Sequence, residues 1–206
     1  MTDQYYTSDP RSESRPRSFQ LDRHGRTILF KTDAGVFSKG ELDQGTRLLL
    51  DALPTLSGHV LDMGCGWGAI GVSLAVETPG LHVTMADVNR RALQLAAENA
   101  EQNGVRDRCR VVESDGFAAL ENEMYDAVVT NPPIRAGKQV IYGMFADAAV
   151  HLKPDGALYL VIRKQQGAES CIRYLSSLYH QVEKLDRSGG FWVIRAAGAK
   201  EEEPHV

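Results

Sequence analysis

The stretch LDMGCGWGA, residues 61–69, connects a short apolar segment to one in which apolar residues recur at helical spacing. Glycine occupies every second position from Gly64 to Gly68. Glycine accepts positive φ angles and lets the backbone approach a ligand closely, so this pattern between a strand and a helix is typical of a nucleotide-binding turn. A tight turn without a ligand is the simpler interpretation. We favour a ligand site, because a tight turn alone does not require three alternating glycines.

Segments on both sides of this turn alternate between strand-like and helix-like patterns. The expected strands are 59–62, 81–86, 110–113, 125–130 and 157–162, and the expected helices are 48–53, 69–76, 89–103, 139–151 and 168–179. Two closing strands, 181–186 and 191–196, flank a Gly-Gly pair and predict an antiparallel hairpin. The alternation implies a Rossmann-like α/β fold, with a seven-stranded, mostly parallel sheet covered by helices on both faces.

The two ends of the chain differ in composition from the central part. Residues 1–18 are polar, which predicts a flexible arm, and the acidic tail at 199–206 is expected to be disordered. Two short apolar segments, 19–21 and 26–30, surround a glycine-containing turn and predict a small β-hairpin within an N-terminal extension, 19–40. The length of 206 residues suits one domain, which we place at 19–198.

Composition and residue spacing argue against several classes of protein. A hydrophobic fraction of 43% and a charged fraction of 24% are ordinary for a soluble globular protein. No apolar run is long enough to span a bilayer and the N-terminus has no secretory signal, so we expect a cytoplasmic protein. The three cysteines and six histidines lack metal-ligand spacing, so we expect no metal.

Electrostatics help to choose the ligand of the glycine turn. Gly64, Gly66 and Ala69 also fit the dinucleotide pattern GxGxxA, whose pyrophosphate would lie close to Asp62. Two anions in a low-dielectric site repel each other by several kcal/mol. S-adenosylmethionine has no phosphate and carries an ammonium and a sulfonium group. An acid at the turn therefore favours S-adenosylmethionine as the cofactor.

Two further acids follow predicted strands. Asp87 comes at the end of the second strand, where it can accept hydrogen bonds from both ribose hydroxyls; otherwise it caps the next helix. Asp115 precedes Gly116 after the third strand and can reach an adenine amino group, although an Asp-Gly pair often marks only a turn. Because carboxyl ends of parallel strands share one edge of a sheet, these acids are expected near the glycine turn.

The residues after the fourth strand indicate the chemistry. Asn131 precedes Pro132 and Pro133 at the edge where ligands bind. An exocyclic amine on a nucleobase is a poor nucleophile, because its lone pair is delocalised into the ring. The Asn131 side-chain oxygen and the Pro132 carbonyl oxygen can hold both N–H groups of such an amine, and proline fixes φ so that the second carbonyl is aimed in advance. Positioning and electrostatics would then supply most of the rate. The simpler interpretation is that the prolines only end the strand.

In their order along the chain, these motifs resemble the cofactor motifs of class I methyltransferases. That family has the sheet order 3-2-1-4-5-7-6, with strand seven antiparallel. The resemblance implies a set of residues that bind S-adenosylmethionine: Thr46, Asp62, Gly64, Cys65, Gly66, Gly68, Asp87, Val88, Asp115, Gly116 and Asn131.

The tetrad 131–134 resembles the NPP-aromatic motif of amino-group methyltransferases, except that Ile134 replaces the aromatic residue. We expect Phe37 to stack on the base instead. Together with the tetrad, GVFSK at 35–39 and DQGT at 43–46 resemble the RsmC-like small-domain methyltransferases, which methylate guanine N2 in ribosomal RNA. That resemblance covers about residues 19–196. It implies catalytic roles for Asn131, Pro132, Pro133 and Ile134, and substrate contacts for Phe37, Ser38, Lys39, Arg135 and Lys138.

Several alternatives remain open at this point. A protein glutamine methyltransferase acting on release factors uses the same tetrad. An adenine methyltransferase is also possible, because adenine presents a similar amino group to Asn131. A non-catalytic module that binds S-adenosylmethionine and RNA is a third possibility. The net charge of −4 argues mildly against RNA as a partner, whereas the arginines of the N-terminal stretch favour RNA: Arg11, Arg15, Arg17, Arg23 and Arg26. We expect phosphate contacts from them and from Arg163 and Lys164.

Overall fold

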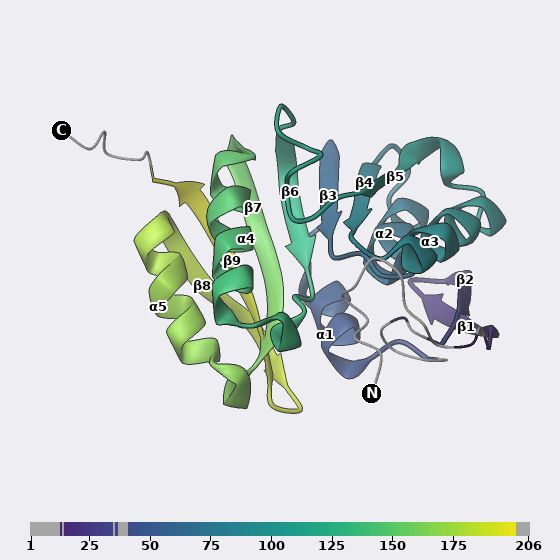
Figure 1. The fold of residues 1–206 in the computed structure, drawn as a ribbon, viewed down its shortest axis with the longest axis horizontal. Coiled ribbons are helices and arrows are strands. Elements are labelled where there is room, and N and C mark those ends of the chain that lie inside the picture. The colour runs from purple at the N-terminus through teal and green to yellow at the C-terminus, as the bar shows by residue number, and fades with distance from the viewer. Residues whose placement is uncertain (1–12, 14, 35, 37–40, 201–206) are drawn as a thin grey trace.

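A seven-stranded sheet in the order β5-β4-β3-β6-β7-β9-β8 runs through the part of the chain that the computed structural model describes, residues 13, 15–34, 36 and 41–200 (Figure 1). Its strands are β3 (His59–Met63), β4 (His82–Asp87), β5 (Cys109–Glu113), β6 (Tyr125–Thr130), β7 (Leu152–Arg163), β8 (Tyr179–Ser188) and β9 (Phe191–Ala199). Strand β9 is antiparallel to β7 and β8, and the remaining neighbours are parallel. This order confirms the predicted fold class.

Helices cover both faces of the sheet. They are α1 (Gln44–Ala52), α2 (Ala69–Glu77), α3 (Arg90–Gln102), α4 (Lys138–Val150) and α5 (Ala168–Leu178), with short 3-10 turns η1 (Arg106–Arg108), η2 (Ile134–Ala136) and η3 (Lys164–Gln166). Successive side chains of a strand point to opposite faces, so the sheet separates two apolar cores. Val60 of β3 joins the core under α1, α2 and α3, whereas Leu61 joins the core under α4 and α5.

The predicted N-terminal hairpin is present as a separate two-stranded sheet, β1 (Arg17–Arg23) and β2 (Arg26–Thr32), which lies at the opposite end of the molecule from α5 (Figure 1). Arg23 holds it to the domain: its side chain is buried and pairs with Asp51 of α1 and with Glu77 of α2, the latter at 2.6 Å. Arg23 therefore differs from the expectation that every arginine of this stretch contacts phosphate, because its charge is already neutralised by two carboxylates.

The hairpin also supports the glycine turn. The ring of Trp67 packs edge-on against Phe30 of β2, with 4.9 Å between centroids, and against Phe19 of β1 at 5.5 Å. Asn99 of α3 donates to the carbonyl oxygens of Trp67 at 2.8 Å and of Lys31 at 2.9 Å. Because a buried amide that satisfies two backbone carbonyls fixes both, the turn, α3 and β2 form one unit.

Some elements extend beyond their predicted bounds. Strand β7 begins at Leu152, not at 157, because a register shift between Tyr125 and Ala127 of β6 accommodates the Pro-Asp-Gly sequence at 154–156. A Cβ on Gly156 would lie 3.0 Å from the Tyr125 carbonyl oxygen, so glycine allows the strands to approach there. Strand β1 begins at Arg17, inside the predicted arm, and β9 runs to Ala199.

The described part of the chain has neither a membrane-spanning helix nor a metal-binding cluster. None of its helices combines the length and apolar character needed to cross a membrane. In residues 13, 15–34, 36 and 41–200, no three histidine, cysteine or acidic side chains are grouped so that they could hold a metal ion.

Candidate active site

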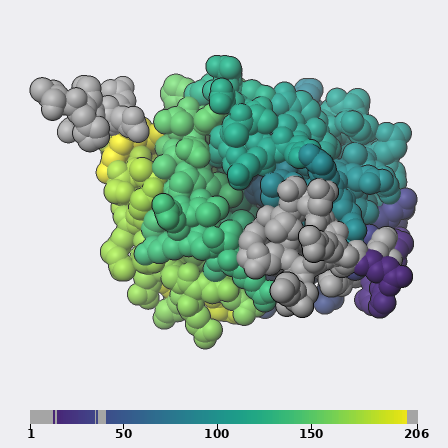
Figure 2. All heavy atoms as spheres, in the orientation of Figure 1, coloured from purple at the N-terminus to yellow at the C-terminus, as the bar shows by residue number. Residues whose placement is uncertain are grey.

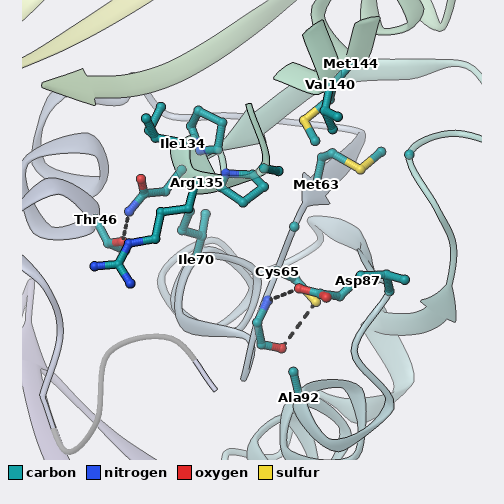
Figure 3. Close-up of a pocket in the computed structure, with 18 of the residues that line it drawn as sticks. Thr46, Met63, Cys65, Ile70, Asp87, Ala92, Ile134, Arg135, Val140 and Met144 are labelled. Atoms are coloured by element: carbon teal, nitrogen blue, oxygen red, sulfur yellow. Dashed lines mark hydrogen bonds between the residues drawn. The ribbon is translucent and has the colours of Figure 1, made fainter. Parts of the chain in front are cut away.

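A cavity of about 1260 Å³ lies at the carboxyl ends of the central parallel strands, where ligands of α/β sheets bind. The space-filling view shows the surface hollowed between teal and green residues (Figure 2). In the close-up, Cys65, Asp87 and Ala92 lie at one end of the cavity, and Thr46, Arg135 and Ile134 at the other (Figure 3). We call these the turn end and the tetrad end.

Backbone atoms build much of the turn end. Gly64 and Gly66 have φ angles of 70° and 56°, and a Cβ on either would meet no atom of the described residues within 4 Å. Both therefore face open space along the cavity wall. The amides of Gly64 and Cys65 donate to the Ala86 carbonyl oxygen at 2.8 and 3.0 Å, which ties the turn to the end of β4. A ligand can approach this backbone without meeting a side chain of the described residues.

Asp87 joins the turn to the start of α3. Its carboxylate accepts hydrogen bonds from the amides of Gly66 at 2.8 Å and of Asn89 at 2.9 Å. Burial raises the pKa of Asp87, and these backbone donors act in the opposite direction. The cap of α3 is Asn89, whose side chain accepts from the Ala92 amide, so Asp87 is not that cap. Asp87 lines the cavity together with Val88, Ser114, Asp115 and Gly116.

Asp62 lies behind the turn, outside the cavity wall, which corrects the expectation that its charge faces the ligand. One carboxylate oxygen accepts from the Gly71 amide of α2 at 2.8 Å. The other is buried and has no hydrogen-bond partner in the described residues. Burial, with a smaller effect from the negative charge of Asp87, raises the pKa of Asp62 to about 7.

Two other predicted site residues also lie outside the cavity wall. Gly68 caps α2 with a φ of 85°, and a Cβ there would lie 3.2 Å from both Met85 and Ala96, so this glycine serves helix packing. The Lys138 ammonium group lies 4.9 Å from the centroid of the Tyr142 ring, in a cation–π contact. Phe37, Ser38 and Lys39 fall outside the described residues.

Side chains from distant parts of the sequence meet at the tetrad end. The Asn131 amide nitrogen donates to the Thr46 hydroxyl oxygen at 2.9 Å, drawn as a dashed line in Figure 3, and to an Asp43 carboxylate oxygen at 3.4 Å. A carboxylate only accepts hydrogen bonds, so the NH₂ group of Asn131 faces Asp43 and its carbonyl oxygen is free. Neither that oxygen nor the Pro132 carbonyl oxygen accepts a hydrogen bond within the described chain.

Sequence reasoning missed Phe191 and gave Arg163 only a phosphate contact, although both line the tetrad end. The Arg163 guanidinium lies 4.5 Å from the centroid of the Phe191 ring. Arg163 ends β7, so the rule that ligands bind at the carboxyl ends of strands pointed to it. Phe191 gave no comparable signal, because it begins an antiparallel strand. Ile134 lines the cavity and packs its partly buried side chain on the α4–α5 core.

Comparison with known proteins agrees with this geometry. The family model for the methyltransferase small domain matches residues 27–195. Among curated relatives, the "Uncharacterized protein YbxB" of Bacillus subtilis is 40% identical, over 95% of this chain and 98% of that protein. "Ribosomal RNA small subunit methyltransferase C" of Hahella chejuensis is 43% identical over 67% of this chain and 41% of that protein; its Vibrio parahaemolyticus counterpart is 32% identical over 87% and 52%.

A solved structure is similar to this chain over most of its length. The T. thermophilus 16S rRNA N2 G1207 methyltransferase (RsmC), in complex with AdoMet and guanosine, superposes with a TM-score of 0.79 at 27% identity. The match covers 88% of this chain and 50% of that protein, so this chain spans about half the length of the RsmC proteins and nearly all of YbxB. The resemblance drawn from the sequence motifs is confirmed: the chain belongs to the methyltransferase small domain family.

Proposed function

We propose that this methyltransferase uses S-adenosylmethionine to methylate the exocyclic N2 amino group of guanine in ribosomal RNA. The observation that carries the proposal is the pair of free acceptors at the tetrad end, the Asn131 side-chain oxygen and the Pro132 carbonyl oxygen. The names of the RsmC relatives and the guanosine in the T. thermophilus structure support the choice of base.

The turn end suits the cofactor. The open backbone at Gly64 and Gly66 can lie against it, and Asp87, Val88 and Asp115 are available to its ribose and adenine. When bound, S-adenosylmethionine supplies an electrophilic methyl group on a positively charged sulfur. The AdoMet in the T. thermophilus RsmC structure supports S-adenosylmethionine over a dinucleotide as the ligand of this end.

The tetrad end suits an amine attached to an aromatic ring. The Asn131 and Pro132 oxygens can each accept one of its N–H groups, which draws the nitrogen towards a tetrahedral geometry and localises its lone pair. These two contacts then strengthen in the transition state, where the N–H bonds become more acidic. The methylated nitrogen loses its proton readily, so the reaction needs no strong general base in the protein.

Charge at the cavity rim favours a nucleic acid over a protein. Arg135 and Arg163 line the cavity, and neither makes an ion pair with a described carboxylate. Arginines without a described carboxylate partner next to a site match the phosphates of an RNA chain, whereas a neutral glutamine side chain would not require them. Ile134, Val140 and Met144 offer aliphatic contacts for a base turned out of its helix, in place of an aromatic fourth tetrad residue. An adenine amine fits the same acceptors, so adenine is the second candidate.

The test is to give the purified enzyme tritiated cofactor with naked ribosomal RNA, assembled ribosomal subunits and release factor in parallel. We expect label on N2-methylguanosine after nucleoside mass spectrometry. Label on methyladenosine would change the base, label on glutamine would overturn the RNA assignment, and no transfer with any acceptor would favour a non-catalytic binding module.

A variant pair tests the rim arginines in the same assay. Arg135→Ala should weaken RNA binding and reduce the slope of log affinity against log salt concentration by about 1, because one phosphate contact is lost. Lys184→Ala is the matched control: Lys184 lies on β8, its ammonium is 3.3 Å from the centroid of the Trp192 ring of β9, and it does not line the cavity. Equal slopes in both variants would remove Arg135 from the RNA interface.

A further inference from the structure

The start of α1 contacts the Asn131 side chain directly. We infer that Thr46 and Asp43 are positioning residues, which fix the orientation of the Asn131 amide and polarise its carbonyl oxygen towards the acceptor amine. The inference rests on the proposed function for the identity of the acceptor. It assigns Thr46 a role different from the cofactor contact expected from family resemblance.

The hydrogen bonds leave the Asn131 amide one orientation. Its nitrogen has two acceptors at the start of α1, the Thr46 hydroxyl oxygen at 2.9 Å and a carboxylate oxygen of the N-cap Asp43 at 3.4 Å. Turning the amide by 180° would place its carbonyl oxygen against the Asp43 carboxylate and leave the NH₂ group towards the acceptor, where two donors would face each other. This rotation of the amide would remove one of the two acceptors on which the proposed chemistry depends.

The contacts of α1 make this arrangement rigid. The same Asp43 oxygen caps the helix by accepting from the amides of Gly45 at 2.9 Å and Thr46 at 3.1 Å. Gly45 packs so closely on Phe191 that a Cβ there would lie 2.8 Å from the ring. Thr46 itself is 3% exposed, so little water competes for its hydroxyl group. The position of the Asn131 amide is therefore determined by the contact between α1 and β9.

Charge gives Asp43 a second effect. A carboxylate that accepts from an amide N–H polarises the amide, so the carbonyl oxygen at its other end becomes more negative and a stronger acceptor. Removing the charge while keeping the cap should weaken this effect alone. Asp43→Asn meets both conditions, because asparagine is as good a helix cap as aspartate.

The central variant is Thr46→Val, which keeps the shape of the side chain and removes the acceptor for Asn131. We expect kcat to fall by about 100-fold, as for a misplaced catalytic group, with cofactor affinity and the KM for RNA close to those of the parent. Thr46→Ser restores the hydroxyl group and should recover most of the lost kcat. Asp43→Asn should lower kcat by about 10-fold, because one charge-assisted contact becomes neutral. Thr84→Val, at a buried threonine outside the cavity, controls for removal of a buried hydroxyl group.

A second measurement does not depend on turnover. The side-chain amide resonances of Asn131 in ¹⁵N-labelled protein should shift and broaden in Thr46→Val but not in Thr84→Val. Unchanged amide resonances, full kcat in Thr46→Val, or an equal loss in Thr46→Ser would each overturn the inference. If the parent methylates an amine other than guanine N2, the proposed substrate fails while these comparisons still apply to that amine.

Discussion

The two ends of the cavity are built in different ways. At the turn end, neighbouring loops supply backbone amides, and the Asp87 carboxylate accepts a hydrogen bond from the Gly66 amide, only 21 positions earlier in the chain. At the tetrad end, the central hydrogen bond joins Asn131 to Thr46, 85 positions away, and a strand from the far side of the sheet contributes Phe191. A site made of backbone tolerates changes in side chains, whereas a site made of distant side chains depends on the packing of whole elements.

This difference predicts a separation of functions. Changes at the turn end should weaken cofactor binding, because that end holds a ligand in its ground state. Changes at the tetrad end should slow methyl transfer and leave cofactor binding intact, because those contacts gain strength only in the transition state.

The largest effect is expected for Asn131→Ala. The substitution removes one of the two free acceptors, and kcat should fall by about 10²–10³-fold, as when one preorganised hydrogen-bond group is lost from an active site. Single-turnover kinetics would measure the rate, and calorimetry the affinity for S-adenosylmethionine. Loss of cofactor binding together with activity would show that the two ends are not separate, and full activity would exclude Asn131 from the mechanism.

Asp87→Ala should have the opposite signature. It removes acceptors for the ribose hydroxyls and also the bond that holds the Gly66 amide, so we expect cofactor affinity to fall by about 2–4 kcal/mol. At saturating cofactor, kcat should remain near that of the parent. Calorimetry with S-adenosylmethionine tests this, with Asp115→Ala as a milder comparison at the same end. Equal affinity in parent and variant would restrict Asp87 to a structural role, and tight binding of NADH by the parent would contradict the choice of cofactor.

The smallest expected effect concerns Asp62, behind the turn. Its pKa of about 7 in the folded protein lies above the ordinary aspartate value of 3.8, so between about pH 4 and 7 the folded state retains a proton that the unfolded chain has lost. The free energy of unfolding should therefore decrease as pH rises through this window. Asn does not titrate, so Asp62→Asn should flatten the dependence by up to about 1.4 kcal/mol per pH unit.

Urea unfolding of the ligand-free protein at several pH values would measure this slope. Asp87 also has a raised pKa and is present in both proteins, so the difference between the two slopes reports the titration of Asp62 together with its interaction with Asp87. Identical slopes would mean that the Asp62 carboxylate is hydrated in solution.

Resemblance to a known family supplied the strand order. The sequence by itself determined the alternation of strands and helices, the glycine turn, and the proposal that Asn131 contacts the acceptor. Those features follow from local patterns: apolar periodicity, glycine spacing, and the rule that ligands bind at the carboxyl ends of parallel strands. Even the departure at Ile134 was visible, because one residue differs from a short motif.

Only the tertiary structure decided which charges face the cavity. Asp62 and Asp87 lie near the carboxyl ends of neighbouring strands. The Asp62 carboxylate nevertheless accepts from the amide of Gly71 in α2, whereas Asp87 lines the cavity. Arg23 and Arg135 look alike in the sequence, but Arg23 is buried and paired with two carboxylates, whereas Arg135 lines the cavity and makes no ion pair with a described carboxylate. The contact of Thr46 with Asn131 was equally hidden. The physical reason is that burial and ion pairing depend on partners from other elements, and a local pattern carries no record of where those elements pack.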